Sequence, residues 1–229
     1  MAPIITLSNA TFRWKADQAP TLDIPSLNIE QGQHLFLKGP SGCGKSTLLS
    51  LITGINTVSS GSLSALGQEL NALSASQRDR FRADHVGYIF QQFNLLPYLS
   101  VIDNVTLPCR FSPKRKSKVQ GSLDQEAKLL LDQLRLPKSL INKPVVELSI
   151  GQQQRVAAAR ALIGQPELLI ADEPTSALDH DNREAFISLL MEQANQANST
   201  LVFVSHDPTL ESLFTRSENL MDINQVSGS

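Results

Sequence analysis

Residues 39–46 read Gly39-Pro40-Ser41-Gly42-Cys43-Gly44-Lys45-Ser46, which matches the pattern G-x-x-x-x-G-K-[ST] at every fixed position. Glycines are required in such a loop because backbone N–H groups wrap closely around phosphate oxygens, in conformations that a Cβ excludes. A short apolar strand at 34–38 leads into the loop, and an amphipathic helix follows it from Lys45 to about Gly54. The positive end of that helix points at the same anion. The stretch therefore predicts a site for the phosphates of a nucleotide.

Two side chains of this loop have separate predicted roles. Lys45 can reach the β- and γ-phosphates of a nucleotide, and the hydroxyl of Ser46 can bind Mg²⁺. The residues that we expect to bind the nucleotide in this region are Gly39, Pro40, Ser41, Gly42, Cys43, Gly44, Lys45, Ser46 and Thr47.

The second half of the predicted site is the apolar run 168–171 followed by Asp172 and Glu173. A strand that ends in two acids places them at the carboxyl edge of a parallel sheet, where ligands bind in open α/β folds. Asp172 is the expected partner of Mg²⁺, directly or through a water molecule. Glu173 is then placed to orient or deprotonate the attacking water. Such an acidic pair can also simply cap a helix, and the phosphate loop upstream favours the catalytic interpretation.

Strand and helix patterns alternate along the chain. Strand patterns occur at 4–8, 22–38, 86–90, 168–171 and 201–204. Helical patterns occur at 45–54, 74–84, 123–135, 151–163 and 181–196. The last two strand patterns are continuously apolar, which is typical of strands covered on both faces of a parallel sheet. The alternation predicts an α/β fold.

The composition is that of a globular protein with a buried core. Of the 229 residues, 41% are hydrophobic and 18% are charged, and the net charge is −2. This charge gives no reason to expect nucleic acid as the main partner. The two cysteines, Cys43 and Cys109, do not form a disulfide framework and are expected to be reduced. The N-terminus lacks the pattern of a secretory signal, and no stretch approaches the roughly 18 apolar residues of a membrane span. We therefore expect a cytoplasmic protein whose role at a membrane depends on a partner.

A second anion site is predicted at residues 148–155, which read Leu148-Ser149-Ile150-Gly151-Gln152-Gln153-Gln154-Arg155 and precede a helix. A serine hydroxyl and a flexible glycine at a helix N-terminus suit an anion. This stretch, about 20 residues before the acidic pair, resembles the signature sequence of the ABC (ATP-binding cassette) ATPases, LSGGQ in its commonest form.

The resemblance covers essentially the whole chain. It implies the ABC ATPase fold, which is a P-loop NTPase with a RecA-like core, an antiparallel β subdomain and an inserted α-helical subdomain. It places residues 1–229 in one nucleotide-binding domain, with the helical subdomain at approximately 92–155. It also implies the binding and hydrolysis of ATP with Mg²⁺.

The resemblance also implies a head-to-tail homodimer. The sequence itself permits one, because one chain carries two phosphate-binding helix ends and only one nucleotide loop. In the family, the loop of one copy faces the signature of the other. The signature residues here are Leu148, Ser149, Ile150, Gly151 and Gln152.

Four further positions match the family in order and spacing. Gln91 resembles the Q-loop glutamine that touches Mg²⁺ and senses the partner permease. Asp179 resembles the D-loop aspartate that contacts the opposite copy, and His206 resembles the switch histidine at the γ-phosphate. Trp14 lies where the family has an aromatic residue stacked on adenine. The resemblance thus implies Glu173, His206 and Gln91 as catalytic residues and Ser46, Gln91 and Asp172 as metal-binding residues.

Ile150 departs from the family pattern, because it replaces the first glycine of LSGGQ. A β-branched residue excludes left-handed backbone conformations and narrows the approach to the γ-phosphate. Since Ser149 and Gly151 are retained, we expect activity to survive, with an effect of Ile150 on nucleotide-driven dimerisation.

Residues 76–82, 86–97 and 101–105 resemble one bacterial subgroup, the ATPases of lipoprotein-release complexes, of macrolide-type exporters and of the cell-division complex. Their integral-membrane permeases carry few membrane helices and a large periplasmic domain. Residues 92–105 would then receive the coupling helix of the permease at the inner face of the inner membrane. Four apolar or aromatic residues there suit either an anchor patch or the core of the helical subdomain. They are Phe93, Leu95, Leu96 and Tyr98.

Alternatives remain open at this stage. A cell-division-type ATPase that regulates periplasmic hydrolases and an importer ATPase share parts of these motifs. The basic run 113–118, Pro-Lys-Arg-Lys-Ser-Lys, suits a nucleic-acid or lipid patch or a solvated loop, and we expect the loop.

Overall fold

The computed structural model describes residues 3–175 and 180–226. It divides into two compact units, which we describe separately. Residues 1–82 and 202–229 form the loop unit, which contains the phosphate loop. Residues 83–201 form the helical unit, which contains the acidic pair and the signature.

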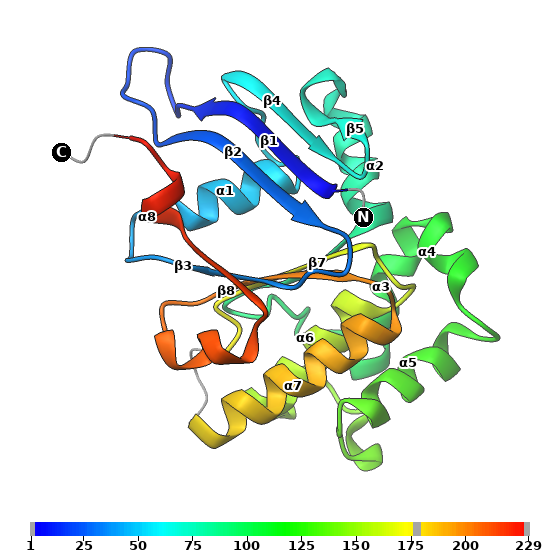
Figure 1. Cartoon of the computed structure of the whole chain (residues 1–229). Coiled ribbons are helices and arrows are strands. Elements are labelled where there is room, and N and C mark those ends of the chain that lie inside the picture. The colour runs from blue at the N-terminus through cyan, green and yellow to red at the C-terminus, as the bar shows by residue number, and fades with distance from the viewer. Residues whose placement is uncertain (1–2, 176–179, 227–229) are drawn as a thin grey trace. The chain divides into compact units, whose positions relative to one another are not determined.

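The loop unit contains an antiparallel sheet with the strand order β2-β1-β4-β5 (Figure 1). Its strands are β1 (Pro3–Phe12), β2 (Leu22–Glu30), β4 (Ser60–Ala65) and β5 (Gln68–Glu69). Leu7 of β1 pairs with Leu27 on one side and with Leu63 on the other, and all three side chains are buried. Every second residue is buried along Ile5–Leu7 and again along Ala10–Phe12, as expected of a sheet with one covered face.

Parallel pairing holds the strand that precedes the phosphate loop. β3 (Leu35–Lys38) lies between β8 (Thr200–Val204) and β9 (Arg216–Asn219), with Leu35 opposite Val202 and Arg216. The rings of Phe36, Phe203 and Phe214 pack together at centroid distances of 5.3–6.2 Å. The described residues of this unit also form five helical segments. They are α1 (Lys45–Ile52), η1 (Leu70–Ala72), α2 (Ala75–His85, which ends beyond the unit), η4 (Pro208–Leu213) and α8 (Leu220–Ile223).

The helical unit is built on two parallel strands, β6 (Val86–Ile89) and β7 (Leu168–Asp172), with Val86 opposite Leu168. The first four residues of β7 are fully buried, which confirms a strand covered on both faces. α6 packs directly on β6, because a Cβ on Gly87 would lie 2.2 Å from the carbonyl oxygen of Ala161. The helices are α3 (Val101–Phe111), α4 (Pro113–Lys118), α5 (Leu123–Gln133), α6 (Ile150–Leu162) and α7 (His180–Gln196), with η2 (Lys138–Leu140) and η3 (Val145–Glu147) between α5 and α6.

The predicted α/β fold is confirmed, and one local prediction is wrong. The basic run 113–118 forms the helix α4 and is not a solvated loop. Arg115 within it is 2% exposed, because its guanidinium binds backbone carbonyl groups of α6 and β6. The extent of the helical subdomain, about 92–155, and the single domain of 1–229 stay predictions.

Candidate nucleotide site

The phosphate loop has the backbone that its glycines were expected to provide. Gly39, Gly42 and Gly44 have φ values of 153°, 81° and 105°, which residues with a Cβ rarely adopt. A Cβ on Gly39 would also lie 2.7 Å from the Sγ of Cys43. The glycines therefore leave the inside of the loop lined by backbone.

The side chain of Lys45 folds back onto the backbone of the phosphate loop. Lys45 is the first residue of α1 and only 8% exposed, and its Nζ donates hydrogen bonds to the carbonyl oxygens of Gly39 at 2.6 Å and Pro40 at 2.9 Å. The first turn of α1 carries no acidic residue, and no side chain caps its N-terminus. N–H groups, a helix N-terminus and a buried ammonium group together fit a polyphosphate. Ser46 follows Lys45 and is exposed, and Thr47 is buried.

Two further predicted residues belong to the loop unit. Trp14 is 60% exposed and meets Phe12 edge-on, with ring centroids 5.0 Å apart and planes at 85°. A large part of the indole surface therefore stays accessible for stacking. His206 is exposed and lies just beyond the end of β8.

The acidic pair lies at the carboxyl end of β7 in the helical unit, as predicted. Asp172 is the last residue of the strand, and Glu173 follows it with a φ of 46°. A non-glycine residue in this left-handed region carries backbone strain, which is found preferentially at functional sites. Tyr88 of β6 donates a hydrogen bond to Oδ2 of Asp172 at 3.4 Å. Burial, and then the charge of Asp172, raises the pKa of Tyr88, so the phenol keeps its proton.

The signature residues start α6. Ser149 is its N-cap, and its Oγ accepts from the N–H of Gln152, while the side chain of Gln152 accepts from the N–H of Ser149 at 2.9 Å. Ile150 is the first helical residue and is 54% exposed. Its backbone is right-handed, so the predicted conflict between a β-branched residue and a left-handed conformation does not arise. Leu148 is buried and Gly151 lies within the first turn.

Two α6 residues to which the sequence analysis assigned no role of their own connect the signature helix to other predicted site segments. Gln154 is 1% exposed and donates to the carbonyl oxygen of Pro174, next to Glu173, at 3.0 Å. Arg160 donates to the carbonyl oxygen of Asn94 at 2.6 Å. Both acceptors are backbone atoms, so no side-chain pattern in the sequence could have indicated these contacts.

The remaining predicted residues divide between surface and core. Gln91 is exposed and follows β6 by two residues. Phe93 is 6% exposed and belongs to the core, whereas Tyr98 is 77% exposed. Leu95 and Leu96 are half-buried. Asp179, the predicted D-loop residue, lies outside the described residues.

The chain's sequence matches the family described as ABC transporter over residues 22–176. The chain belongs to this family. It is an ATP-binding, ATP-hydrolysing subunit of an ABC transporter, of the kind that dimerises and works with a membrane permease. None of the described helices is long and apolar enough to cross a bilayer.

Similar proteins and structures agree with this assignment. The uncharacterised ABC transporter ATP-binding protein YbbA of Escherichia coli K12 is 41% identical over 181 residues, which are 79% of this chain and 77% of YbbA. The lipoprotein-releasing system ATP-binding protein LolD of Buchnera aphidicola is 39% identical over 203 residues, which are 89% of this chain and 86% of LolD. The dimeric cassette MJ0796, solved with ADP and Pi, superposes with a TM-score of 0.81 at 33% identity. The superposition covers 94% of this chain and 93% of the MJ0796 chain.

Proposed function

We propose that this chain is the ATPase of a lipoprotein-release-type complex, in which ATP drives a mechanical stroke of a permease with a large periplasmic domain. The observation that supports this subgroup is the similarity to three LolD ATPases, at 39%, 37% and 38% identity over 89%, 81% and 86% of this chain. In this proposal the protein lies in the cytoplasm, at the inner face of the inner membrane. A cell-division-type or importer ATPase is the alternative outcome of the tests below.

Within this proposal, each ATP is held between two copies of the chain. The loop N–H groups and the ammonium of Lys45 bind the phosphates in one copy, where Trp14 stacks on the adenine. Ser149 and the N-terminus of α6 in the other copy face the γ-phosphate, and Asp179 contacts the opposite copy. The buried position of Lys45 inside its own loop supports this role, because the ammonium needs little rearrangement to meet a phosphate.

The proposed chemistry is in-line transfer of the γ-phosphoryl group to water. Glu173 accepts a proton from the water as its oxygen bonds to phosphorus, and the bond to the bridging oxygen breaks. His206 and Gln91 orient the γ-phosphate and the water. Mg²⁺, held by Ser46, Asp172 and Gln91, would neutralise phosphate charge, as oxygen ligands of this kind suit the ion. Tyr88 supports the proposal because it orients the carboxylate of Asp172.

The permease is proposed to contact the segment 91–105. Tyr98 in this segment is 77% exposed, and Phe90, which precedes the segment in the chain, is 37% exposed, while Phe93 is buried and anchors the segment to the core. Large exposed aromatic side chains are typical anchors of protein interfaces.

The site assignment is tested with Glu173→Gln. This variant should bind ATP with wild-type affinity, accumulate as a dimer in ATP and lose turnover by about 10²–10⁴-fold, because only the proton acceptor is removed. The dimer is measured by sedimentation and the turnover by phosphate release. Turnover close to that of the wild type would refute the role of Glu173.

The subgroup is tested on the assembled complex. The tagged chain is purified from detergent-solubilised membranes, its permease is identified, and both are reconstituted in vesicles that contain a lipoprotein. ATP-dependent release of the lipoprotein that fails with Lys45→Ala supports the proposal. A permease without a large periplasmic domain, or hydrolysis coupled to uptake of a solute, would overturn the subgroup and leave the ATPase intact.

A further inference from the structure

The basic helix α4 is the one motif of the sequence that the proposed function does not use. Its N-cap, Ser112, is fully buried, accepts from the N–H of Arg115 at 3.0 Å and donates to Asp84. Arg115 is 2% exposed, whereas Lys116 on the same helix is exposed. Because burial of a charged side chain is costly, Arg115 must be held by strong interactions.

The partners of Arg115 are backbone carbonyl groups at the end of α6 and at the beginning of β6. Nε donates to Ile163 at 2.9 Å, Nη2 donates to Ala161 at 2.7 Å, and Nη1 donates to Val86 at 3.3 Å. A helix C-terminus carries unpaired carbonyl groups and a partial negative charge, so a guanidinium suits it. Burial lowers the pKa of Arg115 to about 10, which leaves it charged at neutral pH.

The lysines of α4 hold the segment that begins β7. Lys118 lies 3.1 Å and Lys114 3.3 Å from Oε1 of Glu167, the residue before β7. Nδ1 of His85 lies 3.0 Å from Oε2 of the same carboxylate. Burial alone would raise the pKa of Glu167, but the hydrogen bonds from His85 and Lys118 outweigh it and hold this pKa well below its usual range.

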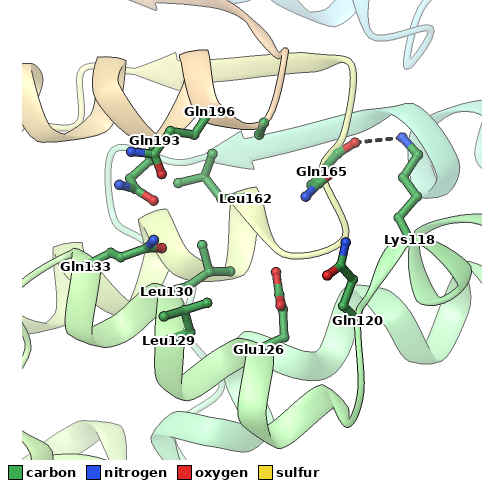
Figure 2. A pocket seen from close by; sticks show the side chains of 11 residues that line it. Lys118, Gln120, Glu126, Leu129, Leu130, Gln133, Leu162, Gln165, Gln193 and Gln196 are labelled. Atoms are coloured by element: carbon green, nitrogen blue, oxygen red, sulfur yellow. Dashed lines mark hydrogen bonds between the residues drawn. The ribbon is translucent and has the colours of Figure 1, made fainter.

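A second lysine contact secures the turn between α6 and β7. Lys118 donates to the carbonyl oxygen of Gln165 at 2.7 Å, and Figure 2 shows this bond beside a cavity of about 250 Å³ that both residues line. Gly164 in the turn has a φ of 67°, and a Cβ there would lie 2.6 Å from the carbonyl oxygen of Arg115. α4 therefore lies directly against the α6–β7 turn.

These contacts join the far ends of three elements whose other ends form the site. α6 starts with the signature, β6 leads to Gln91, and β7 ends in Asp172. Near its N-terminus α6 is already bound to Pro174 through Gln154. Gln154 thus binds α6 to the residue that follows the acidic pair, and Arg115 binds the C-terminus of α6 to the start of β6.

We propose that Arg115 is a positioning residue for ATP hydrolysis, which fixes the C-terminus of α6 to β6 and so sets the place of the signature relative to Gln91 and the acidic pair. The proposal rests on the proposed roles of these residues. The expected loss is in turnover and in ATP-driven dimerisation, and not in the binding of nucleotide by one copy. The reason is that the phosphate loop belongs to the loop unit, whereas all contacts of α4 described above lie in the helical unit.

The test uses Arg115→Met, which keeps an unbranched apolar stem and removes the guanidinium, and Lys116→Ala as an exposed control on the same helix. Leu131→Ala serves as a stability control, because Leu131 is fully buried in the helical unit and takes no part in the hydrogen bonds and ion pairs of α4 given above, and its truncation lowers stability. For each variant, unfolding in urea, the Kd of a fluorescent ADP analogue and kcat at 25 °C are measured. Dimerisation is measured in the Glu173→Gln background.

We expect Arg115→Met to lower kcat about tenfold or more and to weaken the ATP-driven dimer by a similar factor, because small misplacements of catalytic groups are costly. The Kd for the ADP analogue should stay within about twofold of the wild-type value, a change in binding free energy that is smaller than RT. Lys116→Ala and Leu131→Ala should keep kcat. Equal losses of kcat in Arg115→Met and Leu131→Ala, or a loss confined to nucleotide affinity, would overturn the positioning role.

If Arg115→Met does not fold, Arg115→Lys is used to test the positioning role. Lysine keeps the charge but lacks the planar fork with which Arg115 reaches the carbonyl groups of three residues, so it should fold and show an intermediate loss of kcat. Wild-type kcat in this folded variant would refute the proposal. Failure of the lipoprotein-release test would not affect these measurements, because they use the ATPase alone. Wild-type turnover in Glu173→Gln would instead show that the underlying site assignment is wrong.

Discussion

Replacement of Gly87 by alanine tests the close packing of β6 against α6. The new Cβ would lie 2.2 Å from the carbonyl oxygen of Ala161, whereas ordinary contact begins at 3.4 Å, so the two elements must separate by about 1.2 Å (3.4 − 2.2). Leu169 Cδ1 lies 3.0 Å away, so the new methyl group has little room to turn aside. Overpacking of this kind costs about 1–3 kcal/mol, and the reduced entropy of the unfolded chain offsets about 0.4–1 kcal/mol. We therefore expect a net loss of about 1.3 kcal/mol, or roughly 3–5 °C in the melting temperature of a chain of this size.

The matched control is Gly67→Ala in the loop unit. Gly67 has a φ of 73° but no atom within 4 Å of its Cβ, so the substitution carries only backbone strain, of about 1 kcal/mol, which the same reduction in unfolded-chain entropy partly offsets. Both variants are compared by scanning calorimetry under identical conditions, and their kcat values are measured at 25 °C. Gly87→Ala should melt below Gly67→Ala and should also lose turnover, because α6 carries the signature. If Gly87→Ala melts at or above the temperature of Gly67→Ala, the contact between β6 and α6 is not as tight as described.

Substitutions at three further positions address the site and its support. Lys45→Ala removes a charged donor to the phosphates. Since a hydrogen bond from a charged group contributes about 1.5–3 kcal/mol, the Kd for ATP should rise roughly ten- to hundredfold. An unchanged Kd in a fluorescence titration would show that Lys45 does not bind the nucleotide. Ser149→Ala deletes the cap of α6 and should lower stability by about 1 kcal/mol, whereas Ser149→Gly should cost only a few tenths; equal urea midpoints for wild type and Ser149→Ala would argue against the cap. Glu167→Gln should destabilise the protein at pH 7. Because the folded pKa of Glu167 is depressed, this stabilisation is present above the unfolded pKa of about 4.3 and is lost as the pH falls toward the folded value. Urea unfolding between pH 7 and the acid range should therefore show wild type and variant converging, and a constant difference would contradict the ion-pair description.

Much of the fold could be predicted because its strands carry strong local patterns. The run 168–171 is continuously apolar, and the structure places it in β7, buried on both faces. Residues 101–111 received no helix prediction, although they form α3 with Pro108 inside it. Proline normally interrupts a helical pattern, and here the packing of α3 on α5 and α6 prevails over that preference. β5 has only two residues, which is too short for any period to be detected.

The basic helix α4 shows the limit of sequence patterns more clearly. Its residues carry no apolar period, so charge alone predicted a solvated loop. Arg115 is nevertheless buried, because its acceptors include the carbonyl group of Ile163, 48 positions away in the chain. Backbone carbonyl groups are the same for every residue type, so an arginine that binds them has no partner visible in the sequence. The phosphate loop could be predicted for the opposite reason, since its geometry depends on glycine itself.

Ile150 shows how the structure changes the meaning of a departure from the family pattern. As the first residue of α6, it needs only a right-handed conformation, which isoleucine adopts readily. The reciprocal hydrogen bonds between Ser149 and Gln152 form a capping box, which does not depend on the residue at position 150. The side chain of Ile150 is 54% exposed and is therefore not fixed in a packed core. Any influence of Ile150 on dimerisation must accordingly act through steric contact with the nucleotide or the second copy, and not through the fold of the chain that carries it.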